Sequence, residues 1–128
     1  MPNASLRTRI LVVDDEPALL RLLEQYLVRS GHEVETCGSA SRALELYGDD
    51  PAAYSLVVAD LRMPGMSGEE LLEKLMQRNP SIRIVVCSGY PFEHLERRPG
   101  IERQIRFVQK PFLPRMLDQA IRELIDSV

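Results

Sequence analysis

Carboxylates stand directly after two apolar runs of this 128-residue chain. Asp14 and Asp15 follow the run at 10–13, and Asp60 follows the run at 56–59. If both runs are parallel strands that end at the same sheet edge, the three side chains converge there. Converging carboxylates repel one another and raise each other's pKa values, so a fold that holds them together needs a cation. Oxygen ligands indicate magnesium, with manganese as the alternative.

Two further polar residues close apolar runs. Ser88 follows the run at 82–87 and precedes Gly89, and Lys110 closes the run at 105–109. A hydroxyl and an ammonium beside a metal-binding carboxylate cluster suit a phosphoryl group, with one carboxylate left as the nucleophile toward phosphorus. Each residue also has a structural reading: Asp15 can favour a helix N-terminus, Ser-Gly is a common turn, and Lys110 can be a solvated strand end.

The order of elements predicts where these residues meet. Five short apolar runs alternate with amphipathic stretches, which is typical of an α/β domain with a parallel sheet covered on both faces. We expect strands at 10–13, 32–37, 56–59, 82–87 and 105–109, and helices at 18–28, through Ala43 and Tyr47 to near Gly48, at 71–76 and at 116–125. Between the last two strands, prolines leave room only for a short or distorted fourth helix at 91–104, which would make five helices.

The strand order follows from the same pattern. The first, third and fourth runs are apolar at 10–13, 56–59 and 84–87, as central parallel strands are, whereas the second and fifth alternate like half-exposed edges. This predicts the flavodoxin-like order 2-1-3-4-5. Its ligand crevice lies between the first and third strands, outside their carboxyl ends, where Asp14, Asp15 and Asp60 stand.

Composition narrows the class of protein further. The chain is 45% hydrophobic and 27% charged with a net charge of -3, which indicates one globular domain without a nucleic-acid or anionic-membrane surface. Cys37 and Cys87 have no metal-ligand spacing, and no signal peptide or membrane span is present, so a reducing cytoplasmic compartment is expected. His32 and His94 are isolated and are expected at the surface.

Four motifs, in order and correctly spaced, resemble the receiver (response regulator, CheY-like) domain of two-component signalling. They are ILVVDDEP, VVADLRMPGMSGEELL, IVVCSGY and FVQKPF. The resemblance runs from Arg9 to Val128, so we expect a receiver domain over 9–128 after a flexible N-terminal tail at 1–8. The last two motifs look more like receivers attached to hybrid sensor histidine kinases than like those of transcription factors.

The resemblance implies a role for each site residue. Asp60 is the phosphoacceptor, and Asp14 and Asp15 hold magnesium together with Asp60 and the backbone carbonyl of Arg62. Lys110 pairs with the phosphoryl group. Ser88 and the aromatic Phe107 form the conformational switch, and the bond from Lys110 to Pro111 is usually cis.

Two positions that border the path of hydrolytic water in such domains are Arg62 and Tyr90. Both are bulky, and neither offers an acid or an amide to orient an attacking water. We therefore predict a slowly decaying acyl phosphate.

The implied partner is a histidine kinase or a histidine phosphotransfer protein, with an unknown output partner and a monomeric or weakly dimeric state. The domain would act on itself rather than turn over a substrate. One alternative is a phosphorylation-independent interaction module on a receiver fold. Another is a magnesium-dependent aspartyl phosphotransferase, but that class carries a second Asp two residues after the nucleophile, where this chain has Arg62.

Overall fold

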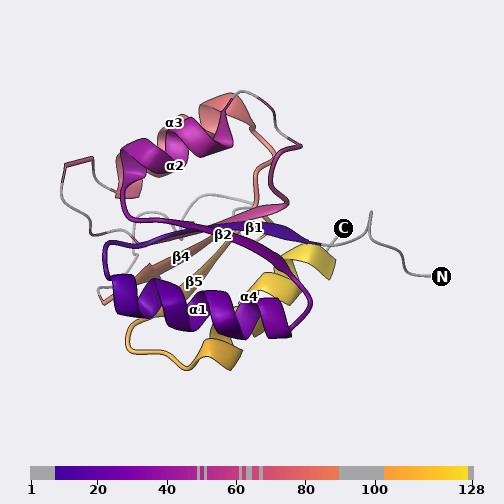
Figure 1. The fold of residues 1–128 in the computed structure, drawn as a ribbon. Coiled ribbons are helices and arrows are strands. Elements are labelled where there is room, and N and C mark those ends of the chain that lie inside the picture. The colour runs from indigo at the N-terminus through magenta and orange to yellow at the C-terminus, as the bar shows by residue number, and fades with distance from the viewer. Residues whose placement is uncertain are drawn as a thin grey trace.

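The computed structural model describes residues 8–48, 50, 52–60, 62, 65–66, 68–89 and 103–126. Within them lie five strands and four α-helices, and these correspond to the five strands and to all of the expected helices except the short one at 91–104 (Figure 1). In chain order the elements are β1 (Arg9–Val13), α1 (Pro17–Arg29), β2 (Glu33–Cys37), α2 (Ala40–Tyr47), β3 (Leu56–Asp60), α3 (Gly68–Arg78), β4 (Ile84–Ser88), β5 (Ile105–Gln109) and α4 (Pro114–Asp126).

The strands form one parallel sheet in the order β2-β1-β3-β4-β5, which confirms the predicted topology. Every residue of β3 and β4 is buried, and in β1 only the first residue is exposed. The edge strands β2 and β5 retain partly exposed positions. The continuous apolar runs thus mark the centre of the sheet because both faces of a central strand are covered.

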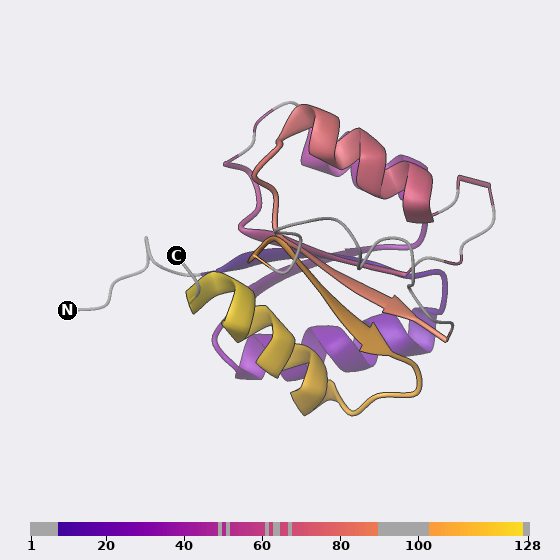
Figure 2. The same cartoon turned by 180° about the vertical axis from the view of Figure 1, so that it is seen from behind.

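Two helices cover each face of the sheet (Figures 1 and 2): α2 and α3 lie on one side, and α1 and α4 on the other. Successive side chains of a strand point to opposite faces. In β1, accordingly, Leu11 and Val13 join the core beneath α2 and α3, whereas Ile10 and Val12 join the core beneath α1 and α4. The crossover helices are what make a parallel sheet of this kind possible.

Local signals explain where two of the helices begin and end. Pro17 is the first residue of α1, where its missing N–H costs nothing, and Gly31 follows the helix with a φ of 99°. The N-terminus of α2 is capped by Ser39, whose hydroxyl accepts a hydrogen bond from the backbone N–H of Arg42 at 3.2 Å. These ends agree with the sequence interpretation to within one or two residues.

Several expected boundaries differ from the structure. The third helix spans Gly68–Arg78 rather than 71–76, and the last helix spans Pro114–Asp126 rather than 116–125. The fourth strand begins at Ile84 rather than at position 82, because the backbone N–H of Ile82 donates to the carbonyl of Asn79 (3.0 Å) and so belongs to the preceding turn. The second strand begins at Glu33 rather than at His32. The short fourth helix expected at 91–104 falls almost wholly outside the described residues, as does His94, and both stay predictions.

The expectation that His32 is a surface residue is also wrong. Its side chain is only 6% exposed, and Nε2 lies 2.9 Å from Oδ1 of Asp118 in α4. Asp118 also accepts a hydrogen bond from Nε of Arg122 (3.0 Å), and Arg122 in turn donates to the backbone carbonyl of Ser30 (3.0 Å). A polar partner from a distant helix is what permits burial of the imidazole, and no periodicity in the sequence reveals such a partner.

Cys37 and Cys87 are free and buried. Among the described residues no helix is long and apolar enough to cross a membrane.

Candidate functional site

The predicted site residues gather at the carboxyl edge of the sheet. Asp14 comes directly after β1, Asp60 and Ser88 are the last residues of β3 and β4, and Lys110 comes directly after β5. Parallel strands deliver these residues to one edge because all four strands end there. The backbone N–H of Lys110 donates to the carbonyl of Ser88 at 2.7 Å, which fixes the start of the segment after β5.

Three carboxylates converge as the sequence predicts. Asp14, Asp15 and Asp60 each place a carboxylate oxygen within 4.8 Å of the other two. Asp14 and Asp60 are buried, with 3% and 5% of their surface exposed, whereas Asp15 is exposed. The cluster therefore has two buried ligands and one that faces solvent.

Lys110 bridges the two buried carboxylates. Its Nζ lies 3.0 Å from Oδ2 of Asp60 and 3.1 Å from Oδ2 of Asp14. The other oxygen of each carboxylate accepts a backbone N–H: Glu16 donates to Oδ1 of Asp14 at 2.9 Å, and Arg62 donates to Oδ1 of Asp60 at 3.0 Å. Both buried carboxylates are thus oriented through both of their oxygens.

The charges of this cluster do not balance. Burial raises the pKa of Asp14, and the neighbouring Asp60 charge adds to this, although hydrogen bonds from Glu16 and Lys110 work the other way. Burial works to lower the pKa of Lys110, but its hydrogen bonds to Asp60 and Asp14 outweigh that effect and raise it. Three carboxylates share one ammonium, so the site retains excess negative charge that a divalent cation would neutralise.

The donor set fits magnesium or manganese. Within the described residues it consists of carboxylate oxygens alone, which hard divalent cations prefer, and the exposed Asp15 leaves the cluster open to solvent on one side. Asp14, Asp15 and Asp60 are the side chains that would hold the ion. The backbone of Arg62 lies beside Asp60 through its N–H contact.

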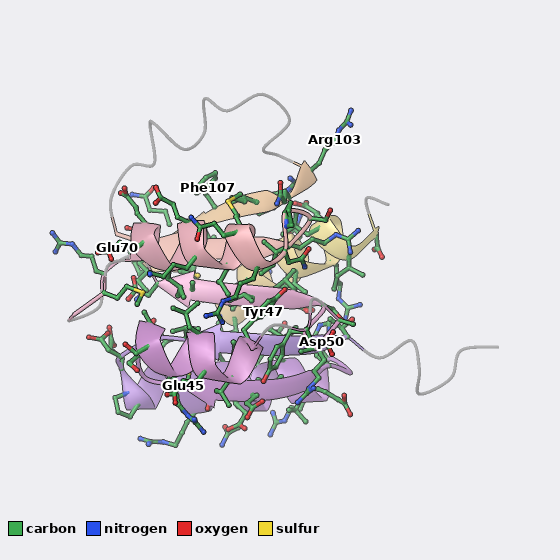
Figure 3. The ribbon with its side chains drawn as sticks, turned by 90° about the horizontal axis from the view of Figure 1, so that it is seen from above. Glu45, Tyr47, Asp50, Glu70, Arg103 and Phe107 are labelled. Carbon is green, nitrogen blue, oxygen red and sulfur yellow. The ribbon has the colours of Figure 1, made fainter. Side chains whose placement is uncertain are left out.

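The structure describes Ser88 and Phe107 but not Tyr90. Ser88 is buried at the end of β4, and Phe107 is half-buried on β5, where it packs against the core beneath α2 and α3 (Figure 3). The bond between Lys110 and Pro111 is cis, as the resemblance implies. Tyr90 lies outside the described residues, so its expected position beside the site stays a prediction.

A hollow beside Lys110 was not foreseen from the sequence. It has a volume of about 340 Å³, and it lies between the first turn of α1 and the segment after β5. Its lining is mainly apolar and consists of Glu16, Leu19, Lys110, Pro111 and Phe112. The available signal was the aromatic Phe112 directly after Lys110 and Pro111, because an aromatic side chain in an exposed loop packs against a nearby surface.

Comparison with known proteins agrees with this geometry. The family model of the response regulator receiver domain matches residues 10–122, and the chain therefore belongs to that family.

Individual relatives support the same assignment. The chain is 32% identical over 123 residues to the response regulator protein FleR of Pseudomonas aeruginosa, covering 94% of this chain and 25% of FleR. It is 29% identical over 118 residues to the sensor kinase CckA of Brucella abortus, covering 92% of this chain and 12% of CckA. The chain thus spans a quarter or less of these relatives.

Among solved structures, the response regulator protein TrrA of Thermotoga maritima, in complex with Mg²⁺ and BeF, superposes with a TM-score of 0.76 at 30% identity, covering 91% of this chain and 98% of TrrA. The chain is thus a receiver domain of two-component signal transduction, and such domains accept phosphoryl groups.

Proposed function

We propose that Asp60 accepts a phosphoryl group from a phosphohistidine of a partner protein. A carboxylate oxygen of Asp60 attacks phosphorus, the P–N bond to the imidazole breaks with its electron pair left on nitrogen, and a P–O bond forms to give an acyl phosphate. The observation that carries this proposal is the bridge of Lys110 between Asp60 and Asp14, at 3.0 and 3.1 Å. It places an ammonium beside a carboxylate oxygen of Asp60, where it would pair with the oxygens of a phosphoryl group bonded to that residue.

The other residues of the cluster complete this function. Asp14, Asp15, Asp60 and the backbone carbonyl of Arg62 would hold Mg²⁺ or Mn²⁺, which when bound supplies positive charge to the phosphoryl oxygens. Lys110 pairs with the same group from the other side. Most of the rate then comes from position and charge rather than from proton transfer.

Conformational signalling is assigned to Ser88 and Phe107. The Ser88 hydroxyl moves toward the phosphoryl group, and the Phe107 ring turns inward behind it. The half-buried state of Phe107, packed against the core beneath α2 and α3, leaves that ring surface still to bury. Phosphorylation then shifts an existing equilibrium between two conformations of the domain.

The partner is proposed to be a histidine kinase or a histidine phosphotransfer protein. The hollow beside Lys110 gives a physical reason for a protein donor, since its apolar lining can receive a side chain next to the phosphohistidine. Leu22 on α1 and Leu113 after Phe112 are exposed apolar side chains on the two segments that line the hollow. Two free, buried cysteines favour a reducing, cytoplasmic location.

Phosphorylation by a small-molecule donor tests the proposal. The protein is incubated with phosphoramidate and Mg²⁺, and its intact mass is compared with that of Asp60→Asn and of the control Asp126→Asn, which changes an exposed carboxylate at the end of α4. We expect one phosphoryl adduct in the wild type and the control, none in Asp60→Asn, and none after removal of Mg²⁺ with EDTA. An adduct on Asp60→Asn would assign the acceptor role to another residue.

A further inference from the structure

The two buried carboxylates of the site already have a cation. All four of their oxygens accept hydrogen bonds from the chain: two from backbone N–H groups, and two from the single ammonium of Lys110. Asp15 is the one exposed member of the cluster. A divalent ion that binds Asp14 and Asp60 must therefore share those oxygens with Lys110.

Sharing is electrostatically unfavourable. Nζ of Lys110 lies 3.0 and 3.1 Å from the two Oδ2 atoms. An ion bound to either oxygen at the roughly 2 Å typical of magnesium is then about 5 Å or less from the ammonium. Even at the permittivity of bulk water, a unit charge and a divalent charge about 5 Å apart repel enough to weaken binding about tenfold.

Burial reduces the screening of the repulsion between the divalent ion and the Lys110 ammonium. The Lys110 side chain is 22% exposed, and those of Asp14 and Asp60 are 5% and 7% exposed. Water and salt reach these contacts poorly, so the repulsion exceeds its value in bulk water.

We propose that Lys110 acts as an internal competitor for the divalent cation and so sets the cation affinity of the three-carboxylate site. This inference rests on the proposed metal-binding role of Asp14, Asp15 and Asp60. It adds that the residue that pairs with the phosphoryl group also weakens cation binding. A bound cation in turn loosens the contact of Lys110 with Asp14 and makes the ammonium available to the phosphoryl group.

Replacement of the ammonium separates charge from shape. Lys110→Met keeps an unbranched chain without charge, whereas Lys110→Arg keeps the charge. The free Mn²⁺ signal in electron paramagnetic resonance gives the dissociation constant of Mn²⁺ for each protein, measured in the same buffer. We expect Lys110→Met to bind Mn²⁺ at least about tenfold more tightly than the wild type, and Lys110→Arg to stay within about threefold of it.

The thermal midpoint with and without Mg²⁺ is a second measurement, and it also shows whether each variant is folded. If Lys110→Met binds the cation more tightly, Mg²⁺ raises its thermal midpoint, followed by circular dichroism, more than that of the wild type. A folded Lys110→Met that binds Mn²⁺ no more tightly than the wild type overturns the inference. Absence of Mn²⁺ binding in every protein, with Asp60 still phosphorylated by phosphoramidate, overturns both the inference and the proposed metal role while leaving the acceptor role intact.

Discussion

Removal of the Asp118 carboxylate should cost this domain a large part of its stability. Asp118 links α4 to two other parts of the chain. It contacts buried His32 just before β2, and it contacts Arg122 on α4, which in turn donates to the carbonyl of Ser30 after α1. Asp118→Ala leaves the imidazole of His32 buried without its partner. Loss of the partner of a buried polar group costs about 1 to 3 kcal/mol, and Arg122 is half exposed and can turn to water, so we expect a loss of about 1 to 3 kcal/mol.

Urea unfolding followed by circular dichroism measures this change, with Asp126→Ala as the control at the exposed end of α4. The control should stay within about 0.5 kcal/mol of the wild type. The effect should also depend on pH. Burial works to raise the pKa of Asp118, but the hydrogen bonds from His32 and Arg122 prevail and lower it.

A carboxyl group whose pKa is lower in the folded state stabilises the fold above its unfolded pKa, and this contribution is lost as the pH falls through the folded value. The difference in stability between wild type and Asp118→Ala should therefore shrink in acid, below about pH 4. A loss under 1 kcal/mol at pH 7, or a difference that grows in acid, would refute the account of this network.

Three further predictions concern the site. Burial and the Asp60 charge raise the pKa of Asp14, so the ionised form of Asp14 is disfavoured in the fold. Asp14→Asn should therefore match or exceed the wild-type thermal midpoint at pH 7 while it loses Mn²⁺ binding. A clear drop in the thermal midpoint would contradict this. The acyl phosphate should survive for minutes or longer in the wild type. Arg62→Asn supplies an amide to orient water and should shorten the lifetime of the acyl phosphate several-fold. A wild-type lifetime of seconds would contradict the proposal that Arg62 slows hydrolysis. Phe112→Ala enlarges the hollow beside Lys110. It should slow phosphoryl transfer from a phosphorylated histidine partner at least about tenfold, while the rate with phosphoramidate changes less than about twofold. Equal losses of rate with both donors would exclude a docking role for the hollow.

The sequence predicts the positions of the strands well because their environments are extreme. The segments 10–13, 56–59 and 84–87, which include Val12, Val58 and Val85, are apolar without interruption, and in a parallel sheet this pattern is typical of strands with both faces covered. Once that order is known, the ends of the strands fix the place of Asp14, Asp60 and Lys110. The convergence of the carboxylates follows from the topology rather than from any local preference.

Contacts between distant elements are what the sequence could not reveal. His32 and Asp118 are 86 positions apart, and each alone reads as an ordinary surface residue. The bridge of Lys110 to both carboxylates depends on side-chain rotamers, and the hollow beside it depends on how α1 packs against the segment after β5. Such features are set by packing, so a pattern of residue types indicates the neighbourhood but not the contact.

The chemical position of the phosphoryl group tests the central claim most directly. Protein phosphorylated with phosphoramidate and Mg²⁺ is treated with borohydride, which reduces an aspartyl phosphate to homoserine, and its peptides are then sequenced by mass spectrometry. The account predicts homoserine at position 60 and unmodified aspartate at Asp14 and Asp15. Homoserine at either of those two positions, or an unreduced position 60 in a protein that carries the phosphoryl group, would contradict it.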